Sequence, residues 1–131
     1  MTTRVVAAVG AGDGFSASAR QRIEAAVDSA QDHAGIAFSV VVGRSEGDSQ
    51  VHARRLLAQV TDPQNPHVLF FISPAQRFVE VVTNAAAHQQ VSDEACSLAV
   101  LSMTTSFSVG DLPGGIVTGL RMVSDAARRA S

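Results

Sequence analysis

The sequence lacks the residues that mark several large classes of protein. Among its 131 residues there is one cysteine, Cys96, and there is no lysine, tryptophan or tyrosine. A single cysteine cannot form an internal disulfide, so a disulfide-built secreted domain is not predicted. The formal net charge of -2 lacks the basic excess of nucleic-acid-binding domains, and no nucleic-acid partner is expected. With 46% hydrophobic residues, the chain is too apolar for a disordered segment.

Long hydrophobic runs are also missing. The apolar run near the N-terminus covers only residues 5–9, and glycines follow it. A signal peptide needs an apolar region of about 7–15 residues, and a transmembrane helix needs about 20. We therefore expect a cytoplasmic protein with no transmembrane segment. Peripheral attachment to the inner face of the membrane is the alternative.

The chain is predicted to form one domain, because no linker, repeat or low-complexity tract interrupts it. Residues 1–15 are interpreted as a flexible or short-strand N-terminal segment, and residues 16–131 as a single α/β domain. This length is common for a domain and can bury a sizeable core.

Apolar residues at helical spacing predict four helices. Their expected N-terminal caps are Ser16 or Ser18, then Asp48 and Ser92, and Pro113 suits the first turn of the last helix. Residue 88 is expected in a polar loop before the third of these helices.

Three strands are predicted over residues 36–42, 68–72 and 78–83. The unbroken apolar run at 68–72 is typical of a central strand that is covered on both faces. A right-handed parallel crossover should join the first two strands, and a hairpin should add the third as an antiparallel partner. The predicted fold class is therefore α/β, with a mixed sheet and helices packed on both faces.

Two glycine motifs invite a phosphate-binding interpretation. Residues 10–14 resemble a dinucleotide loop, but Phe15 stands where that fingerprint needs a small residue, so a plain loop is favoured. Gly114 and Gly115 could present backbone amides to a phosphate, but the nearby carboxylate of Asp111 would repel an anion. We favour close helix packing as the reason for these two glycines.

Histidine and cysteine give no catalytic pattern. The four histidines lie on separate predicted elements without zinc-like spacing, and His33 and His52 are expected on solvated helix faces. Cys96 is expected to be a small core residue. We therefore predict no catalytic residue and no cofactor-binding residue.

One group of polar residues is predicted to meet at an edge of the sheet. Asn65 and His67 precede the central strand, while Thr83 and Asn84 follow its antiparallel partner. If the helix after Ser92 returned to this edge, Asp111 would join them. The group would then form a small polar pocket; the alternative is that Asn84 and Asp111 serve as caps and turn residues.

Several segments together resemble the TPM domain, a module shared by a thylakoid phosphatase-like protein, a photosystem II repair protein and bacterial membrane-linked relatives. The resemblance covers about residues 15–127 and is closest to a compact actinobacterial family of unknown function. The segments that carry it are residues 38–40, 72–74, 80–83, 99–103 and 107–119. The most specific stretch is residues 106–116, which contains Gly110 and Asp111.

The resemblance implies an α/β sandwich, and in some relatives a divalent cation bound by acidic loop residues. TPM domains typically carry Asp-Asn-Gly just before the central strand, where this chain has Asn65, Pro66 and His67. The missing aspartate removes the kind of negative oxygen ligand that hard cations prefer. Calcium or another divalent cation is therefore only an alternative to no cofactor, with Asn65, Asn84 and Asp111 as the candidate ligands.

Two functions follow from these observations. The first is a non-catalytic TPM-like module that acts through contacts with a protein partner, which could itself be membrane-associated. The alternative is a diverged divalent-cation-dependent phosphatase of the TPM type. Because its candidate site has lost an acidic residue, we favour the non-enzymatic function.

Overall fold

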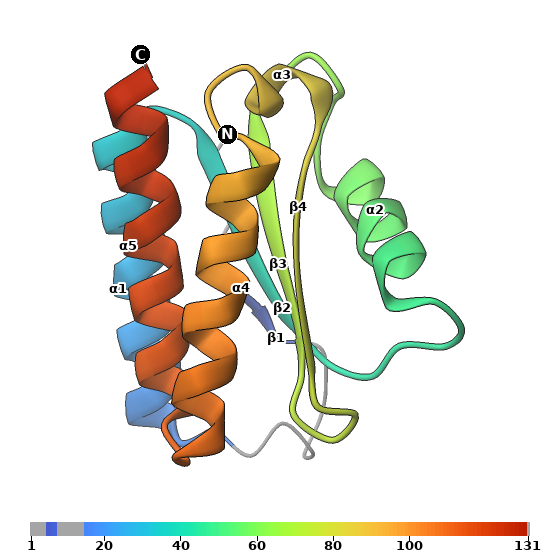
Figure 1. Ribbon diagram of the computed structural model, residues 1–131, viewed down its shortest axis with the longest axis vertical. Helices are drawn as coiled ribbons and strands as arrows, with labels where there is room; N and C mark the ends of the chain where they lie inside the picture. Colours follow the sequence, from blue (N-terminus) through green and yellow to red (C-terminus); the bar gives the residue numbers. More distant parts are fainter. Residues whose placement is uncertain (1–4, 8–14, 131) are drawn as a thin grey trace.

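The computed structural model describes residues 5–7 and 15–130, and it has four strands in a single sheet (Figure 1). The strands are β1 (Val5–Ala7), β2 (Ala37–Val42), β3 (His67–Ser73) and β4 (Phe78–Thr83), and they lie in the order β1-β2-β3-β4. The first three strands are parallel, and β4 pairs antiparallel with β3. The predicted mixed sheet is confirmed. Of the two alternatives for residues 1–15, flexible or short strand, the short strand is present as β1, whereas the glycine loop at 10–14 lies outside the described residues.

Within the described residues, five helices accompany the sheet. They are α1 (Ala17–Ala34), α2 (Ser49–Val60), α3 (Ala85–His88), α4 (Asp93–Ser108) and α5 (Leu112–Ala130). Helices α1, α4 and α5 form a layer on one face, while α2 covers the other face alone (Figure 1). Helices on both faces were predicted, but the single turn of α3 was not, and it places His88 at a helix end instead of in a loop.

The predicted caps explain where the helices begin. The side chains of Ser16, Asp48 and Ser92 accept hydrogen bonds from backbone amides of the first turns of α1, α2 and α4. Each bond satisfies an amide that has no partner inside its own helix. At the end of α1, Gly35 adopts a left-handed conformation with φ 74°, which glycine reaches without strain. Of the two serines considered for α1, Ser16 is therefore the cap, and Ser18 lies within the helix.

The core divides along the alternation of the strands. On the central strand β3, all seven residues are buried. Val68, Phe70 and Ile72 face the three-helix layer, whereas Leu69 and Phe71 face α2. The predicted central strand, covered on both faces, is confirmed.

Helices α4 and α5 approach closely because α5 carries glycine where they meet. A Cβ atom on Gly115 would lie 2.8 Å from the Cβ atom of Ser106, and one on Gly119 would lie 2.8 Å from the sulfur of Met103. Close packing thus accounts for Gly115, as expected. The amide of Gly114 donates to the carboxylate of Asp111 and so already has an anionic partner.

Candidate functional site

The structure brings together two of the three candidate metal ligands, Asn65 and Asn84. The Asn84 side chain donates to the carbonyl oxygen of Asn65 at 2.7 Å, and its own oxygen accepts from the backbone amides of His67 and Ala87. Both hydrogen-bonding groups of this side chain are thus used to cap α3 and to tie it to the start of β3. The alternative role of Asn84 as a cap is confirmed.

Asp111, the third candidate, lies at the opposite end of the sheet. Helix α4 begins near Asn84 and runs away from it for 16 residues, about 24 Å at 1.5 Å per residue. Asp111 follows that helix, and its carboxylate accepts from the amide of Gly114 at 3.0 Å as the cap of α5. The expectation that Asp111 would join the asparagines in one pocket was wrong. It required the helix after Ser92 to return to the sheet edge that holds Asn84, whereas α4 begins at that edge and runs away from it.

No other metal cluster replaces this arrangement among residues 5–7 and 15–130. No group of three or more histidine, cysteine, aspartate or glutamate side chains there is placed to hold an ion.

His67 is buried instead of lining a pocket. Its side chain is on the α2 face of the sheet, where its Nε2 atom lies 2.6 Å from the hydroxyl oxygen of Ser39. The residue is 1% exposed, and burial lowers the pKa of His67 to about 4. The ring is therefore neutral at physiological pH and has no access to a substrate.

His52 also differs from expectation. Its ring stands edge-on to Phe71 with 4.9 Å between ring centroids, and its Nδ1 atom lies 2.9 Å from the hydroxyl oxygen of Ser45. Although His52 was expected on a solvated face, it is half-buried between α2 and the sheet. His33 does lie in solvent, where it pairs with Asp125.

Cys96 is confirmed as a small buried residue of α4. Burial, together with the negative charge of Asp93, raises the pKa of the Cys96 thiol to about 11. Since the thiolate is the reactive form of cysteine, this thiol is a poor nucleophile near neutral pH.

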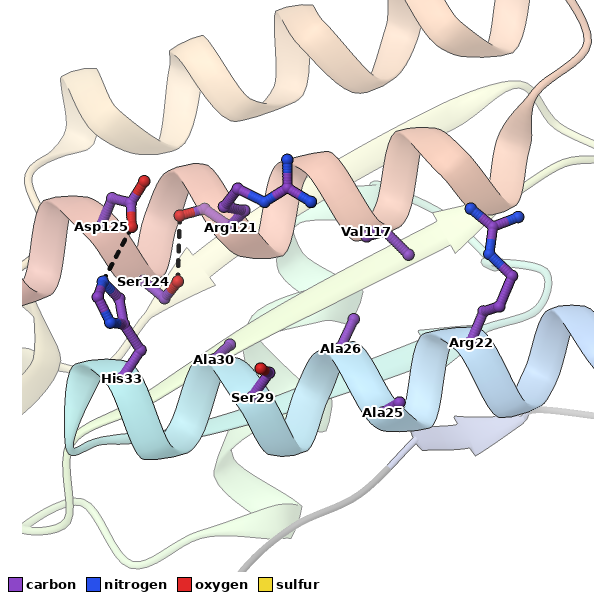
Figure 2. Close-up of a pocket in the computed structure, with 10 residues that line it drawn as sticks. All are labelled: Arg22, Ala25, Ala26, Ser29, Ala30, His33, Val117, Arg121, Ser124 and Asp125. Atoms are coloured by element: carbon purple, nitrogen blue, oxygen red, sulfur yellow. Dashed lines mark hydrogen bonds and ion pairs between the residues drawn. The ribbon is translucent and has the colours of Figure 1, made fainter.

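A groove of about 520 Å³ separates the outer surfaces of α1 and α5 (Figure 2). Small residues of α1, among them Ala25 and Ser29, form part of its lining. The Nε2 atom of His33 and a carboxylate oxygen of Asp125 lie 3.0 Å apart and bridge the two helices there. About half of each of these two side chains is exposed, so the pair adds little stability. Arg22 of α1 and Arg121 of α5 also line the groove, so charged side chains from both helices border it.

The edge of the sheet formed by β4 is more distinctive. Strand β4 is the last strand in the sheet order, and no strand in the described part of the chain pairs with its outer side. Two hollows lie along it, of about 330 and 500 Å³. The first lies against Val81–Thr83 and the second against Phe78 and Val79, and α4 contributes side chains to both.

Helix α4 also presents an unusual outer face. Leu98, Leu101, Thr105 and Val109, which we call the α4 stripe, are exposed at helical spacing. Leu98 is 53% exposed, Leu101 64% and Val109 77%. From residue 97 to residue 109 the sequence contains no charged residue. The α4 stripe is thus an exposed, uncharged helix face, whereas the hollows along β4 contain charged side chains.

Sequence reasoning missed this surface, although part of the signal was present. The apolar residues between Ala95 and Phe107 lie on most sides of the helix and, taken alone, predict that it is largely buried. Burial of a helix on all sides, however, requires neighbours on all sides. In the structure, α4 packs against α5 and β4 and leaves its third side to solvent (Figure 1).

The fold and this surface define a small α/β domain with one exposed, uncharged helix face. Over residues 3–124 the chain matches a family described as a domain of unknown function (DUF5130). The chain belongs to this family.

Relatives extend the comparison without adding an activity. The chain is 29% identical over 89 residues to the uncharacterized proteins Rv2468c and MT2543 of two Mycobacterium tuberculosis strains, a match that covers 68% of this chain. It covers 53% of each relative, so the matched region spans about half the length of these proteins. The more specific resemblance to TPM domains stays a prediction.

Solved structures show the same fold. The BA42 protein of Bizionia argentinensis superposes with a TM-score of 0.77 at 18% identity, over 91% of this chain and 85% of that protein. The N-terminal domain of the cg2496 protein of Corynebacterium glutamicum gives 0.76 at 17% identity, over 98% and 82%. None of the helices described for this chain is both long and apolar enough to cross a membrane.

Proposed function

We propose that the chain is a non-catalytic, TPM-like binding module that acts through contacts with a protein partner. The observation that carries this proposal is the α4 stripe. Contiguous exposed apolar side chains on a soluble surface are typical of interaction sites, because each carries a hydration cost that contact with a partner removes. Charged residues interrupt the outer faces of the other long helices, as Arg54 and Arg55 do on α2.

The proposal includes a place in the cell. We propose that the module works in the cytoplasm and reaches the inner face of the membrane only when its partner is membrane-associated. The alternative function, a diverged divalent-cation-dependent phosphatase, would need Asn65, Asn84 and Asp111 in one site. Their separation along α4 leaves that function without a supporting observation.

A charge placed in the α4 stripe tests the proposal. The tagged chain is compared with a Leu98→Glu, Leu101→Glu double variant in affinity capture from the native cell. A photo-reactive residue at position 105 reports direct contact. We expect a defined cross-linked partner with the wild-type stripe and its loss in the double variant.

Val51→Glu is the matched control, since Val51 is 56% exposed on α2, away from the stripe. It should retain the partner. Equal capture by all three proteins would contradict the proposed function, as would the absence of any cross-link from position 105.

A further inference from the structure

We propose that the β4 edge binds one extended peptide segment of a partner protein, which adds to the sheet as a fifth strand. This inference rests on the proposed function and identifies the kind of partner that the module fits. Four features of the edge support it: its free backbone groups, its lack of protection, its recess between two helices and its charges.

The register identifies the free backbone groups. The amide of Asn84 donates to the carbonyl oxygen of His67, and Val68 stands opposite Thr83. In an antiparallel ladder, residues alternate between those bonded to the neighbouring strand and those whose N–H and C=O point away. Phe78, Glu80 and Val82 therefore bond to β3. Val79, Val81 and Thr83 direct their backbone groups outward.

Those outward groups form a template for another strand. The carbonyl oxygen of Thr83 has only a long contact, 3.4 Å, with the Arg54 guanidinium. Proteins commonly protect such edges with proline, a bulge or an inward-pointing charge. Strand β4 contains no proline, its six residues pair with β3 in unbroken register, and the Glu80 carboxylate is engaged by the Ser49 hydroxyl.

The helices on either side decide what can reach the edge. Helices α2 and α4 both pack on β4 itself, one on each face of the sheet. Neighbouring strands lie about 4.8 Å apart, whereas packed helices need about 8–10 Å between their axes. A second copy that paired its own β4 here would bring its helices into those of the first copy. A single extended chain without flanking helices fits the same space.

The side chains that line the two hollows determine which peptide residues are complementary to them. Arg77 is the one charged side chain lining the hollow at the Phe78 end, whose other walls include Phe107 and Leu112. An apolar side chain next to an acidic one is complementary to this hollow. The hollow at the Thr83 end is lined by two carboxylates, of Glu80 and Asp93, with Arg54. It favours a polar or basic residue.

Side-chain alternation adds a second rule. Successive residues of the added strand would face α4 and α2 in turn. Beyond Asp93 at the start of α4, the α4 wall is uncharged, with Ser97, Val100 and Thr104, whereas Gln50 and Arg54 stand on the α2 side. The peptide should therefore alternate apolar and polar residues. Its backbone supplies affinity, and the two hollows supply specificity.

Display of random octapeptides against the full chain tests this inference. We expect the enriched peptides to alternate apolar and polar residues and to carry an acidic residue at one end. Synthetic versions are then titrated by fluorescence polarisation. Hydrogen exchange should show slower amides at Val79, Val81 and Thr83 when the peptide is bound.

Two changes each remove backbone hydrogen bonds between β4 and the peptide. One alters the protein and the other alters the peptide. Val81→Pro deletes one outward donor and leaves the β3 ladder intact, as an edge strand tolerates. It should weaken binding at least tenfold, whereas Val51→Glu should not change it. Methylating the peptide's own inward-facing amides should have the same effect on wild-type protein, and this arm is informative even if Val81→Pro fails to fold.

Charge reversal tests the orientation in which the peptide lies along β4. Arg77→Glu should weaken binding of the selected peptides, and replacing their acidic residue with lysine should restore it. Arg55→Glu, an exposed arginine on α2 outside both hollows, is the control.

Three results would overturn the inference: no enrichment of alternating peptides, binding that ignores N-methylation, or a dimer of the chain that Val81→Pro dissociates. If the partner is captured through the α4 stripe and Val81→Pro still binds it, strand addition fails while the proposed function stands. If Leu98→Glu with Leu101→Glu leaves capture unchanged, the proposed function fails.

Discussion

The two layers that cover the sheet differ in how they are held. The three-helix layer of α1, α4 and α5 is almost entirely apolar where it meets the strands, and its closest contacts depend on glycine. The α2 layer has a small apolar cluster bordered by hydrogen-bonded polar side chains, including the pairs His67–Ser39 and His52–Ser45. Neighbouring residues of one strand therefore enter different chemical surroundings.

This difference between the layers indicates which of them is sensitive to changes of side-chain volume and which is sensitive to acid. An apolar contact is indifferent to pH and sensitive to volume, whereas a buried neutral histidine is sensitive to pH. The three-helix layer should respond most to changes of size, and the α2 layer to protonation.

The largest expected effect contrasts Phe70 with Phe71. Both are buried on β3, but Phe70 faces the three-helix layer and Phe71 faces α2. Phe70→Ala should cost about 3–5 kcal/mol of unfolding free energy, and Phe71→Ala should fall at or below the lower limit, because a one-helix layer collapses more easily around a cavity. Chemical denaturation measures both. An equal or reversed order would mean that the two layers contribute alike, and a loss under about 1 kcal/mol at Phe70 would contradict its place in the core.

The second prediction concerns acid and His67. In the folded chain its pKa is lowered to about 4 from the ordinary 6.5, so between these values the unfolded chain binds a proton that the folded chain does not. Stability should therefore fall as the pH drops from about 6.5 to 4, by up to roughly 3 kcal/mol, and depend no further on this group below pH 4.

His67→Gln, which keeps a hydrogen-bonding side chain but does not titrate in this range, is the comparison. Denaturation of both proteins at several pH values isolates the histidine from the carboxylates. Parallel pH profiles for the two proteins would show that His67 is not the acid-sensitive group of the α2 layer.

The third prediction uses the two close glycines of α5. Gly115→Ala would push a methyl group against the Ser106 Cβ atom and the Phe107 ring, which cannot move freely, and should cost about 1–3 kcal/mol. Gly119→Ala meets only the Met103 side chain, which is flexible, and the gain in helix propensity of about 1 kcal/mol offsets the contact. Thermal unfolding should therefore separate the two variants. A larger loss of stability in Gly119→Ala than in Gly115→Ala would show that the tighter contact between α4 and α5 lies at Gly119.

Much of the fold followed from local patterns. The caps Asp48 and Ser92, the unbroken strand around Phe70 and the hairpin strand at 78–83 are encoded within a few residues each. The four-residue helix α3 was missed because a single turn has no apolar period, and only the Asn84 cap marks it.

The candidate site was harder to predict, because it depends on distances between elements. Asn65 and Asn84 were placed together correctly, since both adjoin the paired ends of β3 and β4. Asp111 was misplaced because no local pattern reports the direction in which α4 runs. The burial of His52 against Phe71 and the free edge of β4 likewise depend on which elements become neighbours.

The smallest effect is expected at Asp111, in the turn that joins two helices of the three-helix layer. As a cap, its carboxylate accepts one bond from the Gly114 amide, so Asp111→Ala should cost about 1 kcal/mol. Asp111→Asn should cost almost nothing, because asparagine caps nearly as well.

A cation site would behave differently, since an amide oxygen is a poorer ligand than a carboxylate for a hard cation. Thermal unfolding with and without millimolar calcium distinguishes the two roles, with Asn84→Ala as the control at the other end of the sheet. We expect no rise in melting temperature with calcium in either the wild-type chain or Asp111→Asn. A rise in the wild-type chain that Asp111→Asn abolishes would show that capping is not the whole role of this carboxylate, and it would make the phosphatase alternative the better hypothesis.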